Sequence, residues 1–298
     1  SSFPLAFFQV TRFKCGGVCL GCGISHVLVD GVSGIHFINS WSEIARGLSV
    51  SAPPFIDRSL VRARDPPTPA FEHVEYHPLE TLNKVPESST TAMLKITRDQ
   101  LTLLKERSEH KGSTFEVLAA HVWRCMCKAR GLDDDQLTKL KINTDGRPRL
   151  VPPLPQEYFG NFVFTALLMA KSGELQSEPL AKTARRIHDA IARMDDEYLR
   201  SAIDYLELNR SNISPLTLWP RYPNPNLRIN SWIKMPVYDA DFGWGKPIYM
   251  GPARPMNGGV NEGSMFVLPG PNDDRSLRML ICVDSDHMTL FQKYLYDF

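Results

Sequence analysis

The sequence predicts an α/β fold with two layers in each of two domains. Two kinds of segment alternate along its 298 residues. Short apolar or alternating runs are typical of strands, and stretches with an apolar residue every three or four positions are typical of helices. A proline-rich stretch at residues 52–90 shows no sustained period. We interpret it as a crossover between domains, because long irregular segments are uncommon inside one compact domain.

Before the crossover, the sequence predicts a pair of strands followed by a helix. Residues 4–10 and 17–25 are apolar or alternating, with Gly16 and Gly17 between them, and therefore predict strands. Residues 32–47 carry Ile, Phe and Trp side chains mostly on one helical face, and Gly47 ends this pattern.

After the crossover, helices and strands are mixed. The expected elements are, in order, helices at 97–109 and 113–131, strands at 138–150 and 158–170, a long helical region at 178–208, a β-rich aromatic segment at 227–251, strands at 265–270 and 277–284, and a last helix at 287–298. The clearest helix start is Ser113, which is followed three residues later by Glu116 in the pattern of a capping box.

Composition excludes several classes of function. The formal net charge is +1, from 34 basic and 33 acidic residues, which does not favour a nucleic-acid partner. No apolar run approaches the roughly 20 residues that cross a bilayer, so no membrane partner is expected. Six cysteines in 298 residues are too few for a disulfide scaffold. Cys19 and Cys22 lack a second ligand pair, so the sequence predicts no metal site, buried reduced thiols and a cytoplasmic protein.

The segment Ile24–Gly31 reads ISHVLVDG and follows a strand of small residues. An imidazole at His26 can take a proton near neutral pH, which suits a general base. Asp30 can fix the loop through hydrogen bonds or an arginine pair without touching the imidazole. Gly31 permits a sharp turn. The H-x-x-x-D spacing alone occurs often by chance, so it needs a second signal.

That second signal lies far downstream, where Asp241, Phe242, Gly243, Trp244 and Gly245 form the run D-F-G-W-G. The H-V-L-V-D-G and D-F-G-W-G motifs, in this order and separation, resemble those of the plant BAHD acyltransferases. The resemblance covers essentially the whole chain. The stretches most similar to the hydroxycinnamoyltransferase branch, which includes enzymes that act on shikimate or quinate, are 13–17, 36–41, 62–67, 192–207 and 231–252.

The resemblance implies two chloramphenicol-acetyltransferase-like α/β domains with a solvent channel between them and His26 in the middle of the channel. Residues 1–65 would be the remainder of the N-terminal domain, 66–92 the crossover loop and 93–298 the C-terminal domain. Residues from about 236 to 256 would pack back toward the first domain. Family members are longer chains, so we expect a preceding segment, from a fragment or a nicked protein, to complete a monomeric fold.

The activity implied is that of a CoA-dependent O-acyltransferase in plant phenylpropanoid biosynthesis. A p-coumaroyl or caffeoyl group would pass from hydroxycinnamoyl-CoA to a hydroxyl of a small acceptor, shikimate or quinate. His26 would remove the hydroxyl proton, and the oxygen would attack the thioester directly. The sequence has no G-x-S-x-G nucleophile motif, which agrees with a route that lacks an acyl-enzyme. Acyl-CoA would be a co-substrate, with no permanently bound cofactor.

Other site residues also follow from the resemblance. Asn230 and Trp232 align with a family pair that lines the acceptor pocket and stabilises the tetrahedral intermediate; alternatively, both only end a strand. Asp241 is described in the family as a second proton acceptor, but we interpret it as structural, holding its loop against the first domain. Phe242, Gly243, Trp244 and Gly245 are interpreted as packing residues.

The residues that would bind CoA are less clearly marked. Ser113 and Thr114 align with family positions near the nucleotide. Arg147 follows a strand exit, where its guanidinium can meet a phosphate or can simply be a solvated surface charge.

The sequence also leaves more than one acceptor substrate open. Leu218 takes the place of an arginine that grips the acceptor carboxylate in the shikimate and quinate enzymes. Arg221, Arg228 or Lys234 can supply that charge instead; otherwise the acceptor is another hydroxy acid, such as tartrate, malate or hydroxyphenyllactate. Two alternatives belong to other classes of protein. A carrier-dependent condensation domain shares the histidine motif but lacks D-F-G-W-G, and a non-catalytic acyl-CoA or phenolic binder would show no turnover.

Overall fold

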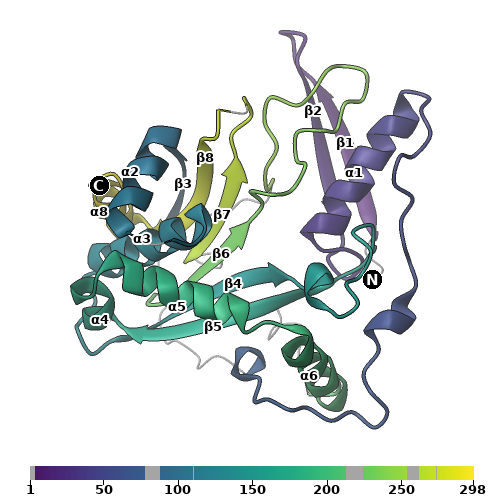
Figure 1. Ribbon diagram of the computed structural model, residues 1–298. Helices are drawn as coiled ribbons and strands as arrows, with labels where there is room; N and C mark the ends of the chain where they lie inside the picture. Colours follow the sequence, from purple (N-terminus) through teal and green to yellow (C-terminus); the bar gives the residue numbers. More distant parts are fainter. Residues whose placement is uncertain (1–3, 78–87, 110, 213–223, 254–261, 273) are drawn as a thin grey trace.

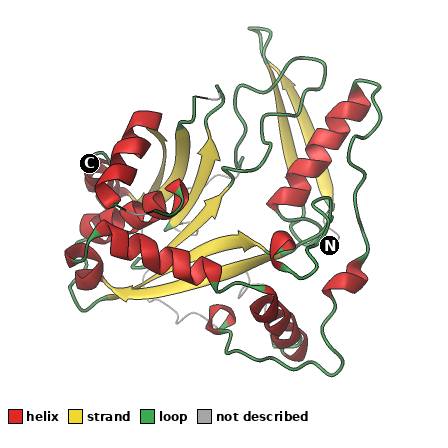
Figure 2. Ribbon diagram, viewed as in Figure 1, coloured by secondary structure: helices red, strands yellow, loops and turns green. Residues whose placement is uncertain are grey.

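The computed structural model describes residues 4–77, 88–109, 111–212, 224–253, 262–272 and 274–298. Its strands form one two-stranded and one six-stranded sheet. Figure 1 shows the small sheet beside helix α1 on the right and the large sheet with most of the helices on the left. Helices and strands are mixed in both parts (Figure 2), so the predicted α/β class is confirmed.

The smaller part is a hairpin with a helix on one side. Strands β1 (Ala6–Arg12) and β2 (Val18–Ile24) pair antiparallel, and helix α1 (Gly31–Ala45) follows them. The ring of Phe8 on β1 packs on the ring of Trp41 on α1, with centroids 4.8 Å apart. Aromatic contacts therefore hold the helix against the hairpin.

The cysteines of the hairpin correct one expectation. Cys19 is exposed and Cys22 is only half-buried, whereas buried thiols were predicted for both. The prediction was wrong because it assumed that both faces of the hairpin are covered, while among the described residues Phe7 on β1 is 63% exposed. Cys125, Cys127 and Cys282, for which no separate prediction was made, are buried.

The crossover residues up to position 77 are irregular, with two short 3₁₀ turns, Arg58–Val61 and Val74–Tyr76. Helix α6 (Asp196–Leu208) ties this segment down. The carboxylate of Asp204 accepts hydrogen bonds from the backbone N of Arg64 and of Thr68, both at 2.8 Å. The buried carboxylate of Asp204 thus holds the crossover segment in place by bonding to its backbone N–H groups.

The large sheet has the strand order β3-β8-β7-β6-β4-β5. Strand β6 runs parallel to both of its neighbours, β4 and β7, and the other pairs are antiparallel. The strands are β3 (Ser89–Ile96), β4 (Leu137–Asp145), β5 (Val163–Lys171), β6 (Leu227–Ser231), β7 (Ser264–Pro269) and β8 (Leu277–Asp284).

Helices cover one face of this sheet (Figure 1) and build the core with it. They are α2 (Arg98–Ser108), α3 (Thr114–Ala129), α4 (Ser172–Ser177), α5 (Leu180–Ala192) and α8 (Ser285–Leu295). The central helix α3 begins at the predicted capping box, in which Ser113 and Glu116 satisfy each other's backbone N–H groups. No helix among the described residues is long and apolar enough to cross a membrane.

Some elements differ from the prediction. Strand β3 was not predicted, because its first residues were assigned to the crossover. The helical region 178–208 is two helices, since Asp195 caps α6 and ends the run after α5. In the segment 227–251, only β6 is a strand. Strand β5 begins five residues later than expected, because peptide groups at 158–162 bond to the site described below instead of to a neighbouring strand.

A buried polar cluster joins the crossover to β4. Lys141 on β4 is 4% exposed, and its Nζ donates to the carbonyl O of Glu75 at 3.0 Å. The carboxylate of Glu75 accepts from the hydroxyl of Tyr198 and contacts the imidazole of His73, each at 2.9 Å. Burial lowers the pKa of Lys141 to about 8, against 10.5 for an ordinary lysine.

We expect this lysine to make stability rise with pH. Between about pH 8 and 10.5, the unfolded chain holds a proton on Lys141 that the folded protein has released, so raising the pH favours the folded state. From pH 8 to 9.5 the gain should be roughly 1–2 kcal/mol. Urea unfolding at several pH values should show the stability of the wild type rising by this amount relative to that of Lys141→Met; the buried thiols of Cys125 and Cys127, whose raised pKa values act in the opposite direction, are common to both proteins. Parallel profiles for both proteins would contradict it.

Candidate active site

The loop between β2 and α1 carries His26. Its start is fixed by a hydrogen bond from the backbone N of Ser25 to the carbonyl O of Leu5 at 2.8 Å. A tight turn follows, in which the N of Leu28 donates to the O of Ser25 at 3.0 Å. His26 is exposed and Val27 is 78% exposed. The histidine therefore stands on a short turn that burial does not hold in place.

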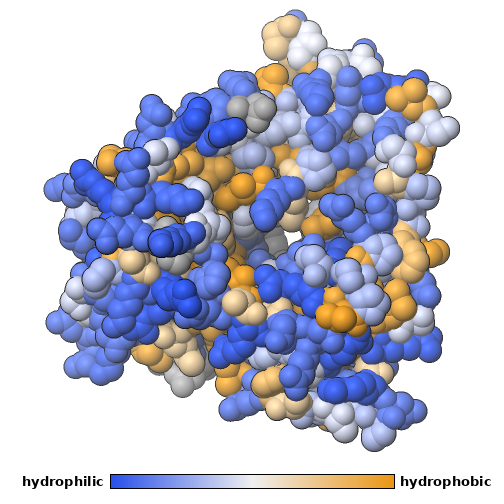
Figure 3. All heavy atoms as spheres, viewed as in Figure 1, coloured by the Kyte–Doolittle hydropathy of each residue, from blue (hydrophilic) through white to orange (hydrophobic). Residues whose placement is uncertain are grey.

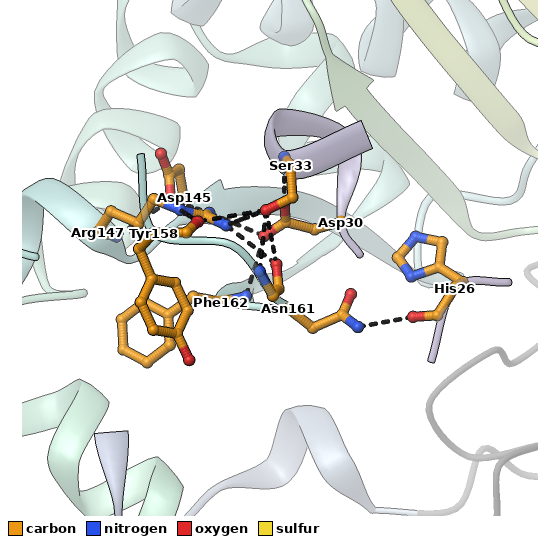
Figure 4. Close-up of polar contacts among 9 residues, drawn as sticks. His26, Asp30, Ser33, Asp145, Arg147, Tyr158, Asn161 and Phe162 are labelled. Atoms are coloured by element: carbon orange, nitrogen blue, oxygen red, sulfur yellow. Dashed lines mark hydrogen bonds and ion pairs between the residues drawn. The ribbon is translucent and has the colours of Figure 1, made fainter. Parts of the chain in front are cut away.

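Asp30 is buried at the N-terminus of α1, with 2% of its surface exposed. Its Oδ1 accepts from the backbone N of Ser33 at 3.0 Å and from Nη2 of Arg147 at 3.1 Å. Its Oδ2 accepts from Nη1 of Arg147 at 2.8 Å and from the backbone N of Phe162 at 2.9 Å. Each oxygen thus accepts two hydrogen bonds, which uses the lone pairs of the carboxylate. In Figure 4 the carboxylate is bonded toward Arg147 and Ser33, and it has no lone pair left for the imidazole of His26.

Arg147 is the partner that holds Asp30, and it is also 2% exposed. Its other hydrogen bonds go to the carbonyl O of Tyr158 and of Gly160, to Ser33 and to the carboxylate of Asp145. Burial lowers the pKa of Arg147, but the hydrogen bonds and charge of Asp30 outweigh it and raise the pKa. All five N–H groups are used, so the expected phosphate contact of Arg147 has no donor to make it.

Gly31 lies in the first turn of α1, where another element approaches closely. A Cβ at this position would lie 3.2 Å from Cε of Met235 and 3.5 Å from Nε1 of Trp232. Its φ is not positive and it is the first residue of α1, so the chain does not use here the conformational freedom that glycine permits. The glycine instead lets the segment after β6 pack against the start of α1, which brings Trp232 beside the motif.

Asn230 lies on β6 in a row of polar side chains. Nδ2 of Asn143 on β4 donates to Oδ1 of Asn230, and the hydroxyl of Thr165 on β5 donates to Asn143 at 3.5 Å. Asn230 is buried and is the last residue but one of its strand. The row therefore fixes the orientation of its amide.

The loop at 241–245 folds around its own aspartate. Oδ1 of Asp241 accepts from the backbone N of Gly243 at 2.8 Å and of Gly245 at 3.0 Å. The hydrogen bond from Gly243 is the largest cause of a lowered pKa of Asp241. Both glycines have a φ of 94°, which other residues rarely adopt. The carboxylate is thus engaged in shaping the loop.

This loop also contacts α1. The ring of Phe242 packs edge-on against Trp41 with centroids 4.9 Å apart, and Asp241 lies 4.0 Å from Nη1 of Arg46. In Figure 1 the segment after β6 crosses from the large sheet to the small one. Figure 3 shows the surface hollowed between these two parts of the fold.

The remaining sequence candidates lie elsewhere or outside the described residues. Ser113 caps α3 and Thr114 begins it. Arg228 is half-buried and donates to Ser264 at 3.1 Å, and Lys234 is exposed. The stretch 214–219 with Leu218, and also Arg221, fall outside the described residues.

Sequence reasoning missed two residues of this site, Ser33 and Asn161. The hydroxyl of Ser33 donates to the carbonyl O of Gly160 at 3.0 Å, and Nδ2 of Asn161 donates to the carbonyl O of His26 at 2.6 Å. The partners in these bonds are 127 and 135 residues apart. A local pattern cannot reveal such pairs; only the position of Ser33 three residues after an N-cap was a usable signal.

Proteins of similar sequence align with the whole length of this chain. Shikimate O-hydroxycinnamoyltransferase of Nicotiana tabacum is 50% identical over 312 residues, which cover 100% of this chain and 71% of the relative. A hydroxycinnamoyl-CoA:5-hydroxyanthranilate N-hydroxycinnamoyltransferase of Avena sativa is 48% identical and is matched over 100% of this chain and 69% of the relative.

Solved structures show the same fold at low sequence identity. The TRI101 protein of F. sporotrichioides, solved with coenzyme A and T-2, superposes with a TM-score of 0.76 at 21% identity, covering 96% of this chain and 67% of that one. A family model described as the transferase family matches residues 1–298. Because that match includes every residue, and because half of the aligned positions are identical to the tobacco enzyme, the chain belongs to the transferase family of CoA-dependent BAHD acyltransferases.

Proposed function

We propose that the protein transfers a hydroxycinnamoyl group from CoA to a hydroxyl of a small acceptor, with His26 as general base and without an acyl-enzyme. The observation that carries the proposal is that the two polar residues of the motif have different environments. The carboxylate of Asp30 is fully bonded within the protein, while the imidazole of His26 stands exposed on the adjoining turn. A base that must reach a substrate needs this accessibility.

The reaction then runs in two steps. His26 takes the proton of the acceptor hydroxyl as the oxygen attacks the thioester carbonyl. The tetrahedral intermediate collapses, the CoA thiolate leaves, and His26 returns the proton to it. The amide of Asn230 and the indole N–H of Trp232 are hydrogen-bond donors that can serve the oxyanion. The packing of Trp232 beside Gly31 supports this role.

For the acceptor, we propose a carboxylic acid that carries a hydroxyl group, with shikimate or quinate first. The tobacco relative is named for shikimate and the oat relative for 5-hydroxyanthranilate, so relatives of nearly equal identity differ in acceptor. Both named acceptors are carboxylic acids. Tartrate, malate and hydroxyphenyllactate are the alternatives.

An acceptor screen with p-coumaroyl-CoA, read by mass spectrometry, tests the proposal. The expected product has the mass of the acceptor plus that of p-coumaric acid, less one water. Free CoA should appear in equal amount, and the reaction without acceptor is the control. If acyl-CoA binds in calorimetry but no hydroxy acid gives a product, the proposed transfer to a hydroxyl group is wrong, and the result favours the non-catalytic acyl-CoA binder.

The remaining site and cellular assignments are also proposals. We place the CoA nucleotide near Ser113 and Thr114 by family alignment, and we assign Asp241 to loop structure because its carboxylate binds its own backbone. We propose that the protein works as a monomer in the cytoplasm, where a reducing environment suits its six free cysteines.

A further inference from the structure

The turn that carries His26 needs a fixed backbone to aim the imidazole. Before the turn, Ser25 is bonded to Leu5, and after it, Asp30 is held by Arg147. Between these points, His26 and Val27 are exposed, so side-chain packing restrains the peptide at His26 only weakly. An exposed turn of this kind opens easily unless polar contacts hold it.

One polar contact reaches this peptide from a distant part of the chain. Nδ2 of Asn161 donates to the carbonyl O of His26 at 2.6 Å. Figure 4 shows the amide of Asn161 directed at that carbonyl, while the imidazole extends away from it. The bond therefore leaves the ring accessible and acts on the backbone that carries it.

The neighbours of Asn161 hold the other end of the motif. The backbone N of Asp30 donates to the carbonyl O of Gly160 at 3.4 Å, and the backbone N of Phe162 donates to the carboxylate of Asp30 at 2.9 Å. Three consecutive residues thus bind both His26 and Asp30, which are the two polar residues of H-x-x-x-D. The segment that contains them leads into β5, whose pairing with β4 makes it rigid.

We propose that Asn161 is a positioning residue for His26: its side-chain amide locks the peptide after His26 and so sets the direction of the imidazole. This inference rests on the proposed role of His26 as general base. An amide N–H is the required chemistry at this point, because the partner is a carbonyl oxygen that can only accept.

The test compares substitutions of Asn161 with a matched control. Asn161→Ala removes the donor, and Asn161→Asp replaces it with an acceptor of nearly the same shape. Asn209→Ala is the control, since Nδ2 of Asn209 also donates to a backbone carbonyl, that of Tyr205 at 2.9 Å, at the end of α6. All variants are measured for kcat, for KM of both substrates and for Tm.

Both Asn161 variants should lower kcat by about tenfold to a hundredfold, the usual effect of a misplaced catalytic group. KM for acyl-CoA and acceptor should stay near the wild type, and Tm should match that of Asn209→Ala. Amide hydrogen exchange of peptides covering residues 24–30 should be faster in both Asn161 variants and unchanged in Asn209→Ala. A fall in Tm with kcat unchanged would mean that the bond is merely structural, and this would overturn the proposal.

A double variant separates this proposal from the proposed function. In a His26→Ala background, Asn161→Ala should cause no further fall in the single-turnover rate, because the group it positions is gone. Additive effects, or a wild-type kcat in Asn161→Ala, would overturn the positioning role alone. If His26→Ala itself kept the wild-type kcat, the general-base function would fail instead.

Discussion

His26→Ala should lower kcat by about 10²–10⁴-fold while the affinity for acyl-CoA stays near that of the wild type. The loss corresponds to roughly 3–5 kcal/mol of activation free energy. The reason is that the imidazole acts on the proton that moves in the transition state. It stands on an exposed turn and is not part of the buried Asp30–Arg147 contact, so its removal should leave the fold intact.

Steady-state and single-turnover rates with p-coumaroyl-CoA and the best acceptor measure this effect, and calorimetry measures acyl-CoA binding. His188→Ala is a suitable control, because His188 lies on α5 and its side chain is also partly exposed. The control should retain wild-type kcat. A His26→Ala protein with wild-type kcat would show that the motif is structural in this chain.

Asp30→Ala should produce the largest loss of stability, about 3–5 kcal/mol in the free energy of unfolding. The substitution removes the buried counter-ion of Arg147, leaves its guanidinium only the partly exposed carboxylate of Asp145, and also removes the N-cap of α1. Activity should fall as well, because the turn that carries His26 ends at Asp30. Urea unfolding at neutral pH measures the change.

A matched control and a compensating variant sharpen this test. Asp189→Ala breaks the pair with Arg185, whose side chains are 58% and 67% exposed, and should cost at most about 1 kcal/mol. Adding Arg147→Met to Asp30→Ala should recover part of the lost stability, because no unpaired buried charge then remains. If Asp30→Ala cost no more than Asp189→Ala, the buried pair would contribute little to the fold.

The parts of the fold that the sequence predicts well are those with local causes. Helix α3 has a strong apolar stripe and a capping box at Ser113, and both signals are formed by residues within or directly before the helix. The break between α5 and α6 was missed because one capping aspartate, Asp195, overrides a helical pattern that continues on both sides. Strand β3 was missed because it follows directly on an irregular segment.

The residues of the candidate site also fall into those that the local sequence indicates and those that only the folded chain brings together. From residue chemistry, the sequence offers His26 as a candidate base, and it offers hydrogen bonds or an arginine pair as the means by which Asp30 fixes the loop. It cannot indicate which arginine, because a position after a strand suits a phosphate contact as well as a carboxylate contact. Only the folded arrangement brings Arg147 against Asp30 and Asn161 against His26, across 117 and 135 residues.

The separation of Asp30 from Arg147 has a consequence for how the chain is made on the ribosome. The arginine that neutralises the aspartate of the histidine motif is translated 117 residues after it. Until then, the nascent chain carries a carboxylate that has no counter-ion with which to enter the interior, so α1 cannot take its final place. Any transcript that stops before the codon for Arg147 therefore encodes the motif without the arginine that holds Asp30, and the motif alone does not identify a working transferase gene.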